Sequence, residues 1–254
     1  MQGTSAQGNE GLLSPARKEP DFSRRADLAE FPELMDQPCS RDEIRGALRD
    51  LARVNRWFLG YRPTLDFLDR LNLRGRGPVR ILDVGSGYGD ALRRVEEWAR
   101  DRSIAVELIG LDLNPDTAVI AAEATPKGSG IRWTTGDVFD HPIEGTADVV
   151  ISSLFTHHLS DADVVRFLRW MEEHAAVGWF VNDLSRAPIP YHLLGWFARA
   201  MRLHRFVQHD GPVSFARAFR AEDWRALCAA AGLKEDQYRL LPYKPARLCV
   251  SRTK

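Results

Sequence analysis

The stretch ILDVGSGYGD, residues 81–90, decides the fold of this chain. An apolar run with β-branched residues, VRILDV (79–84), leads into the glycines, and a helical pattern follows them. A strand that passes through a glycine-rich turn into a helix is the first half of a βαβ unit. Gly85, Gly87 and Gly89 permit a tight turn and let a ligand approach the backbone closely.

Strand-like and helical segments alternate after this turn. Alternation of this kind predicts an α/β fold, a doubly wound and mainly parallel sheet with helices on both faces. The further strand-like segments are AVELIGLD (105–112), IRWTTGD (131–137), ADVVISSLF (147–155) and VGWFVNDL (177–184).

The end of the chain departs from the alternation. YRLLPY (238–243) and ARLCVSR (246–252) are separated only by a short Lys-Pro turn, which leaves no room for a helical crossover. If the two strands pair directly, they must therefore be antiparallel. We expect a seven-stranded sheet with an antiparallel last strand.

The segments outside the alternation divide the chain further. Residues 1–35 are rich in Gly, Ser, Pro and charge, and we expect a flexible arm there. Residues 36–74 form an expected helical cap, in which Ser40 and Glu43 have the spacing of a capping box. An aromatic and basic insertion at about 185–220 predicts one helix plus a loop, which together form a lid.

Composition limits the kinds of partner. The 254 residues carry 35 basic and 35 acidic side chains, so there is no global excess of positive charge for nucleic acid. Three scattered cysteines form no CxxC pair, which favours a reducing, cytoplasmic setting. We expect no secretory signal, because residues 1–20 have no basic stretch followed by an apolar core. No apolar run approaches the roughly 18 residues that span a bilayer.

Acidic residues accompany the glycine turn. Asp83 precedes the first glycine, Asp112 ends the second strand and Asp137 ends the third. A carboxylate before a G-x-G-x-G turn is unfavourable for a pyrophosphate, because it places negative charges together. A ligand with an adenosine end and a cationic amino-acid end fits better, and S-adenosylmethionine (SAM) has both.

With these motifs, the segment 79–183 resembles the class I SAM-dependent methyltransferases. The resemblance implies SAM as cofactor, S-adenosylhomocysteine (SAH) as product and no metal. It places the amino-acid part over the glycines, the ribose at Asp112 and the adenine between Leu113 and Asp137. The full set expected to bind the cofactor is Asp83, Gly85, Ser86, Gly87, Gly89, Asp112, Leu113, Asp137, Val138, Ser153 and Arg56.

The flanking segments resemble one branch of that superfamily. FPELMDQP, LARVNRWFLGYR, VNDLSRAPIPYHL and HDGPVSFARAF are similar to segments of the small-molecule methyltransferases found beside polyketide-type biosynthetic enzymes. The resemblance assigns residues 75–254 to the methyltransferase domain. It implies a small-molecule substrate in secondary metabolism.

Histidines are the candidate general bases, because a phenol with a pKa of about 10 reacts better as phenolate. His157 and His158 follow the fourth strand, and His192 lies in the insertion. The alternative is that the His157–His158 pair only caps the next helix or bonds to the backbone. Aromatic residues outside the sheet are the candidate substrate wall, namely Trp57, Tyr61, Tyr191 and Trp196.

We therefore expect methyl transfer to a hydroxyl, or to an activated carbon, of a small aromatic or polyketide-like metabolite. No carboxylate ends the fourth strand, which disfavours a magnesium site. Two alternatives stay open: an NAD(P)-dependent oxidoreductase, and a module that binds SAM without turnover. We expect no nucleic-acid partner and no membrane span, and either a monomer or a homodimer.

Overall fold

A seven-stranded sheet forms the centre of the protein. The computed structural model describes residues 19–140 and 145–254. In chain order the strands are β1 (Val79–Val84), β2 (Val106–Asp112), β3 (Arg132–Thr135), β4 (Ala147–Ser153), β5 (Ala175–Leu184), β6 (Arg239–Tyr243) and β7 (Arg247–Thr253).

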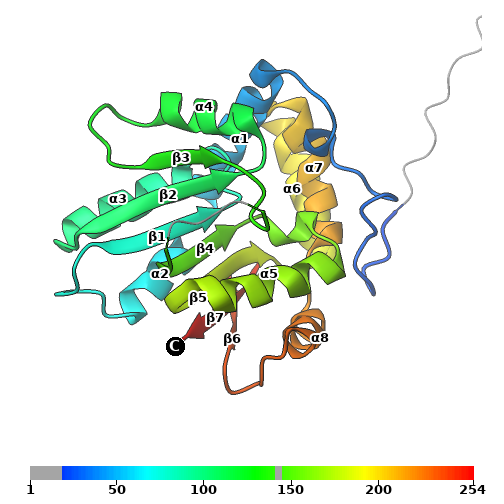
Figure 1. Ribbon diagram of the computed structural model, residues 1–254. Helices are drawn as coiled ribbons and strands as arrows, with labels where there is room; N and C mark the ends of the chain where they lie inside the picture. Colours follow the sequence, from blue (N-terminus) through cyan, green and yellow to red (C-terminus); the bar gives the residue numbers. More distant parts are fainter. Residues whose placement is uncertain (1–18, 141–144) are drawn as a thin grey trace, which may run out of the picture.

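The strands are arranged in the order β3-β2-β1-β4-β5-β7-β6 (Figure 1). β1 to β5 pair in parallel, whereas β7 is antiparallel to both of its neighbours, β5 and β6. The predicted mainly parallel sheet with an antiparallel last strand is confirmed. Because the strands from β1 to β5 are parallel, their carboxyl ends all lie at one edge of the sheet.

Helices cover both faces of the sheet and its carboxyl edge (Figure 1). In the described residues, no helix is long and apolar enough to cross a membrane. The helices are α1 (Arg41–Trp57), α2 (Arg62–Arg70), α3 (Asp90–Asp101), α4 (Pro115–Ala124), α5 (Asp161–His174), α6 (Pro188–Ala200), α7 (Arg205–Arg217) and α8 (Ala221–Ala231).

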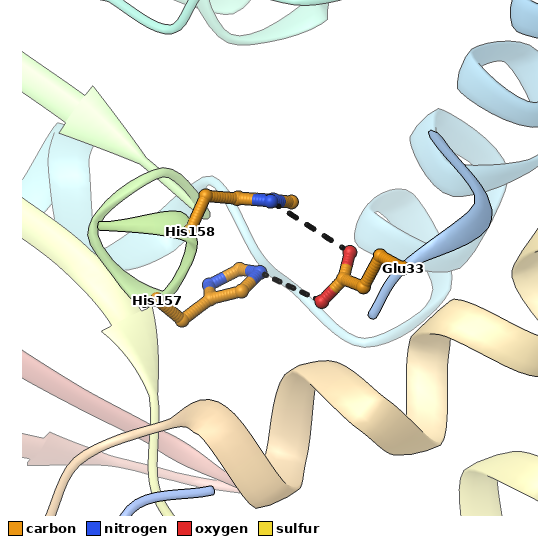
Figure 2. Close-up of side chains that lie close together, drawn as sticks. All are labelled: Glu33, His157 and His158. Atoms are coloured by element: carbon orange, nitrogen blue, oxygen red, sulfur yellow. Dashed lines mark ion pairs between the residues drawn. The ribbon is translucent and has the colours of Figure 1, made fainter. Parts of the chain in front are cut away.

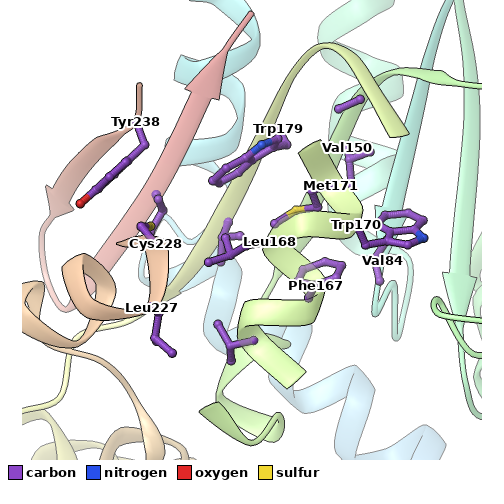
Figure 3. Close-up of a cluster of buried hydrophobic side chains, with 14 of the residues drawn as sticks. Val84, Val150, Phe167, Leu168, Trp170, Met171, Trp179, Leu227, Cys228 and Tyr238 are labelled. Carbon is purple, nitrogen blue, oxygen red and sulfur yellow. The ribbon is translucent and has the colours of Figure 1, made fainter. Parts of the chain in front are cut away.

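Two hydrophobic clusters hold these layers together. Alternation along β1 places Ile81 in the cluster under α2 and α3, and Leu82 in the cluster under α5 and α8. Figure 3 shows the second cluster, in which Phe167 and Leu168 of α5 lie among side chains of the strands and α8. Burial on both faces explains why the central strands are nearly continuous apolar runs.

The predicted cap of α1 is present. The Ser40 hydroxyl accepts from the Glu43 N–H, and the Glu43 carboxylate accepts from the Ser40 N–H at 3.1 Å. This reciprocal pair satisfies two backbone donors that a helix start leaves unpaired.

Residues 19–35 of the expected arm lie against the body of the protein, whereas residues 1–18 are outside the described residues. The Arg25 guanidinium donates to the backbone oxygens of Arg217 at 2.9 Å and Leu159 at 3.1 Å. Charged residues that suggested a solvated arm thus pair with groups of the body.

The predicted lid of one helix plus a loop is wrong. Residues 185–220 contain both α6 and α7, and α7 continues through Pro212. The Gly211–Pro212 pair is locally unfavourable inside a helix, since proline removes a helical hydrogen bond. Almost every residue of α7 from Phe206 onward is buried, so tertiary packing outweighs that local cost.

Gly89 supports a prediction about the stability of the glycine turn. Its φ is +73°, and an added Cβ would lie 2.2 Å from the Trp133 ring. We expect Gly89→Ala to lower the free energy of unfolding by about 3 kcal/mol or more, through backbone strain and overpacking together. Urea unfolding measures this change.

Gly128→Ala is the matched control. Gly128 has a φ of +93° with no atom near an added Cβ, so we expect only the backbone cost of about 1 kcal/mol. Equal losses in the two variants would contradict the packing role of Gly89.

Candidate functional site

The glycine turn is braced by the end of the neighbouring strand. The N–H groups of Gly85 and Ser86 both donate to the Leu111 oxygen, at 2.9 and 3.2 Å. The Gly87 N–H donates to Asp112 Oδ2 at 2.9 Å. Asp112 therefore holds the turn in place.

Asp112 also retains acceptor capacity. Its other oxygen, Oδ1, accepts from the Asn114 N–H at 3.0 Å. Since each carboxylate oxygen has two lone pairs, both can still accept a bond from a ligand hydroxyl. This location, at the carboxyl end of β2, is the one expected for a ribose-binding acid.

Gly85 and Gly87 occupy the turn for different structural reasons. An added Cβ on Gly85 would lie 2.7 Å from Phe155, so neighbouring side-chain packing requires a glycine there. At Gly87 the nearest atom would be Leu48 Cδ2 at 3.6 Å, which leaves the backbone accessible. Both residues have a positive φ, which favours glycine independently of space.

Asp83 is a buried carboxylate without a full set of partners. Its Oδ1 atom is buried and accepts no hydrogen bond from the described residues. Burial raises the pKa of Asp83 well above its usual range, and the nearby carboxylates of Asp90 and Asp112 raise it further. A cation placed beside Asp83 would relieve this energetic cost.

A polar network ties the turn between α1 and α2 to the sheet. The Asn182 side-chain amide donates to the Gly60 oxygen at 2.8 Å, and the Arg247 guanidinium donates to Asn55 Oδ1 at 2.8 Å. The Tyr61 hydroxyl then donates to Asp90 at 2.6 Å, beside the glycine turn. Tyr61, predicted in the substrate wall, is thus placed near the expected cofactor site.

The remaining residues that are expected to bind the cofactor differ in their exposure to solvent. Leu113 and Asp137 are exposed, and Asp137 Oδ1 accepts from the Phe139 N–H at 2.9 Å. Ser86 and Val138 are buried, while Ser153 ends β4 and Arg56 is exposed near the end of α1.

His157, which follows β4, and Asp183, the penultimate residue of β5, form a buried pair. His157 Nδ1 lies 2.8 Å from Asp183 Oδ1, and Asp183 Oδ2 accepts from the His157 N–H at 3.1 Å. Burial by itself would raise the pKa of Asp183, but its bonds with His157, Thr156 and Leu184 outweigh burial and hold it well below the usual range.

An ionised Asp183 determines which nitrogen of His157 carries the proton. A carboxylate only accepts hydrogen bonds, so Nδ1 must donate. In the neutral ring Nε2 is then the basic nitrogen. Nε2 lies 3.9 Å from Glu33 Oε1, beyond hydrogen-bond distance (Figure 2).

His158 is part of a charged cluster with the N-terminal segment. The Nδ1 atom of His158 lies 3.1 Å from an Asp36 carboxylate oxygen and 3.8 Å from a Glu33 carboxylate oxygen. Figure 2 shows that Glu33 faces both histidines. Burial alone would lower the pKa of His158, but the Glu33 and Asp36 carboxylates raise it to about 9. His158 is therefore a cation at neutral pH.

Glu33, His157 and His158 could in principle hold a metal ion, since one atom from each lies within 4.8 Å of the others. A positive charge is already present, however, because Arg217 Nη1 lies 3.3 Å from Glu33. The Ser214 hydroxyl also donates to Glu33 at 3.0 Å. We therefore interpret the cluster as an ion-paired network.

The other predicted residues do not join this cluster. His192 is exposed on α6 and its ring contacts Tyr191, which also packs against Phe22. Trp57 and Trp196 are exposed. Nothing in the described residues connects these four predicted residues to His157.

Several site residues were missed by the sequence prediction. Asp183 lies near the end of the predicted fifth strand, but no pattern in the sequence linked it to His157. Glu33, Asp36 and Arg217 come from segments far apart in the chain and meet only through tertiary packing. The pattern VNDL offered a signal for Asp183, since its acidic residue ends a buried strand.

Comparison with known proteins agrees with this geometry. Residues 81–178 match a family model described as "Methyltransferase domain". The matched residues run from β1 into β5 and include the glycine turn, Asp112 and His157. No curated protein matches the chain in sequence.

Solved methyltransferases share the fold. The plantazolicin methyltransferase BpumL, crystallised with SAH, has a TM-score of 0.59 and 14% identity over 84% of this chain and 96% of its own. Human N-acetylserotonin methyltransferase, crystallised with SAM, has a TM-score of 0.60 and 15% identity over 85% of this chain and 56% of its own. The methyltransferase domain of the citrinin polyketide synthase has a TM-score of 0.55 and 12% identity, over 76% of this chain and 52% of its own.

The raised pKa of His158 predicts how the site responds to pH. Because the folded pKa, about 9, exceeds the ordinary value of 6.5, the stabilisation is complete below pH 6.5 and is lost as pH rises through 9. NMR titration of the His158 ring measures the pKa directly. We expect Asp36→Asn to lower it, and an unchanged pKa would contradict the pairing.

Proposed function

We propose that the protein transfers a methyl group from SAM to a hydroxyl, or to an activated carbon, of a small aromatic or polyketide-like molecule. The observation that carries the proposal is the pair formed by His157, after β4, and Asp183, near the end of β5. It lies at the sheet edge that also carries the glycine turn and Asp112. The candidate base and the glycine turn lie at the same edge of the sheet. This arrangement suits methyl transfer between two molecules that are bound there.

The residues of the glycine turn fit SAM. The unpartnered Asp83 oxygen suits the cationic amino-acid end, and Asp112 has lone pairs for two ribose hydroxyls. When bound, SAM supplies a methyl group already activated on a sulfonium. The protein's own task is then to align the acceptor, exclude water and take up a proton.

His157 is the general base of this proposal. Asp183 keeps Nδ1 protonated and leaves Nε2 to accept the hydroxyl proton of the acceptor. Asp183 acts as a positioning residue, since it orients the ring and stabilises the imidazolium that forms. His158 has a pKa of about 9 and is already protonated at neutral pH. It therefore supplies a positive charge and does not act as the base.

The names of the structural neighbours support a small acceptor. They include a plantazolicin methyltransferase, a human N-acetylserotonin methyltransferase and a putative O-methyltransferase from Nostoc punctiforme. We extend this acceptor class to the present chain as part of the proposal.

Removal of the base tests the catalytic assignment. We expect His157→Gln to lower kcat by about 10²- to 10⁴-fold, because glutamine accepts no proton. The assay measures SAH release from SAM with a panel of phenols. A variant that retains full turnover would contradict the role of His157.

Two further variants separate the roles within the network. We expect Asp183→Asn to lower kcat, because the ring loses the carboxylate that orients it and stabilises the imidazolium, and to move the acid limb of the pH–rate profile to lower pH. His158→Gln should keep this acid limb in place, because His157 and Asp183 are unchanged. Equal effects of His157→Gln and His158→Gln on the pH profile would count against a single base.

Calorimetric titration tests the cofactor site independently of turnover. We expect Asp112→Ala to weaken SAM and SAH binding at least tenfold, through the loss of ribose acceptors and of the brace on Gly87. NADH serves as the comparison ligand. Binding of NADH alone would instead support the oxidoreductase alternative.

Asp83 predicts a proton linked to binding. Burial raises the pKa of Asp83 in the free protein, and a cationic ligand beside the carboxylate would lower that pKa, so we expect binding to release protons. Titration in two buffers with different ionisation enthalpies measures this release. Asp83→Asn is the control, because it cannot release the proton.

A further inference from the structure

An apolar face lies on the outer side of α6. Ile189, Leu193 and Trp196 expose 70%, 60% and 71% of their surface. Their spacings of four and three residues place the three side chains on one side of the helix. Large apolar side chains grouped in this way on a soluble protein mark an interaction surface.

The end of α1 extends this face. The Trp57 and Phe58 rings pack edge-on against Phe197 of α6, with ring centroids 5.7 and 5.4 Å apart. Phe197 follows Leu193 by one helical turn, which makes the two groups continuous. We call this surface the α6 face, and it consists of Trp57, Phe58, Ile189, Leu193, Trp196 and Phe197.

The segments that carry the α6 face are basic. Residues 53–62 and residues 188–205 contain three arginines each and no acidic residue, although the whole chain is neutral. Arg53, Arg62 and Arg205 form ion pairs with neighbouring carboxylates. Among the described residues, no ion pair joins the other three, Arg56, Arg199 and Arg202, to a carboxylate. The positive charge beside the apolar side chains is therefore available to an outside partner.

We propose that the α6 face docks on an anionic lipid surface. Tryptophan and phenylalanine beside arginine are the side chains that favour the boundary between headgroups and acyl chains. A second copy docking through the same face would place arginines against arginines, which disfavours self-association. With 13 residues, α6 is too short to span a bilayer but long enough to lie along its surface.

Sedimentation of the full chain with lipid vesicles tests this proposal without any measurement of turnover. The probes are vesicles of phosphatidylcholine alone and vesicles with about one third phosphatidylglycerol. We expect binding to the anionic vesicles only, weakened when salt rises from about 0.1 to about 0.5 M. Absence of binding to the anionic vesicles would overturn the proposal.

Variants then separate the apolar and electrostatic contributions. We expect Leu193→Ser with Trp196→Ser to lower the partition coefficient at least tenfold, since both lose apolar area that the lipid would bury. Arg199→Gln with Arg202→Gln should weaken binding to anionic vesicles as well. The control is Val119→Ser, at an exposed apolar residue of α4 outside the face, and it should bind like the parent chain.

Two further outcomes would overturn the proposal. One is equal binding by the parent chain and the Leu193–Trp196 variant, with circular dichroism showing that both are folded. The other is a dimer, detected by light scattering without lipid, that the Leu193–Trp196 substitutions dissociate. That result would assign the face to a second copy.

Discussion

The register between β4 and β5 is the constraint on which the site depends. Ser153 lies opposite Asn182, so the residues after each strand emerge together at one edge of the sheet. Because side chains alternate along a strand, Asn182 and Asp183 point to opposite faces. Asn182 then holds the α1–α2 turn, and Asp183 holds His157. A shift of one residue would exchange the two and separate the histidine from its carboxylate.

The N-terminal segment adds charge to the site from outside the sheet. Glu33 is buried, yet its carboxylate is compensated by Arg217 and Ser214 and faces both histidines. A buried carboxylate without such partners would be strongly destabilising. The ion pairs therefore let this segment cover the histidines, and the Glu33 and Asp36 carboxylates raise the pKa of His158 to about 9.

Local sequence patterns predicted the sheet well, but they predicted the N-terminal segment and the insertion at about 185–220 less well. The alternating segments and the final hairpin predicted the sheet, since strand periodicity and turn length act over a few residues. The insertion was predicted as one helix plus a loop, whereas it contains α6 and α7, and α7 includes the locally unfavourable residues Gly211 and Pro212. Burial of α7 reversed that preference, and no short segment carries information about such burial.

The glycine turn, the acids at the ends of β1 and β2, and the antiparallel last strand are all determined within short stretches of chain. They depend on backbone freedom, strand alternation and loop length, which are local properties. The meeting of Glu33, His157, Asp183 and Arg217 was decided only by the tertiary structure. These residues lie up to 184 positions apart, and only the packing of the N-terminal segment and α7 over the ends of β4 and β5 brings their charges together.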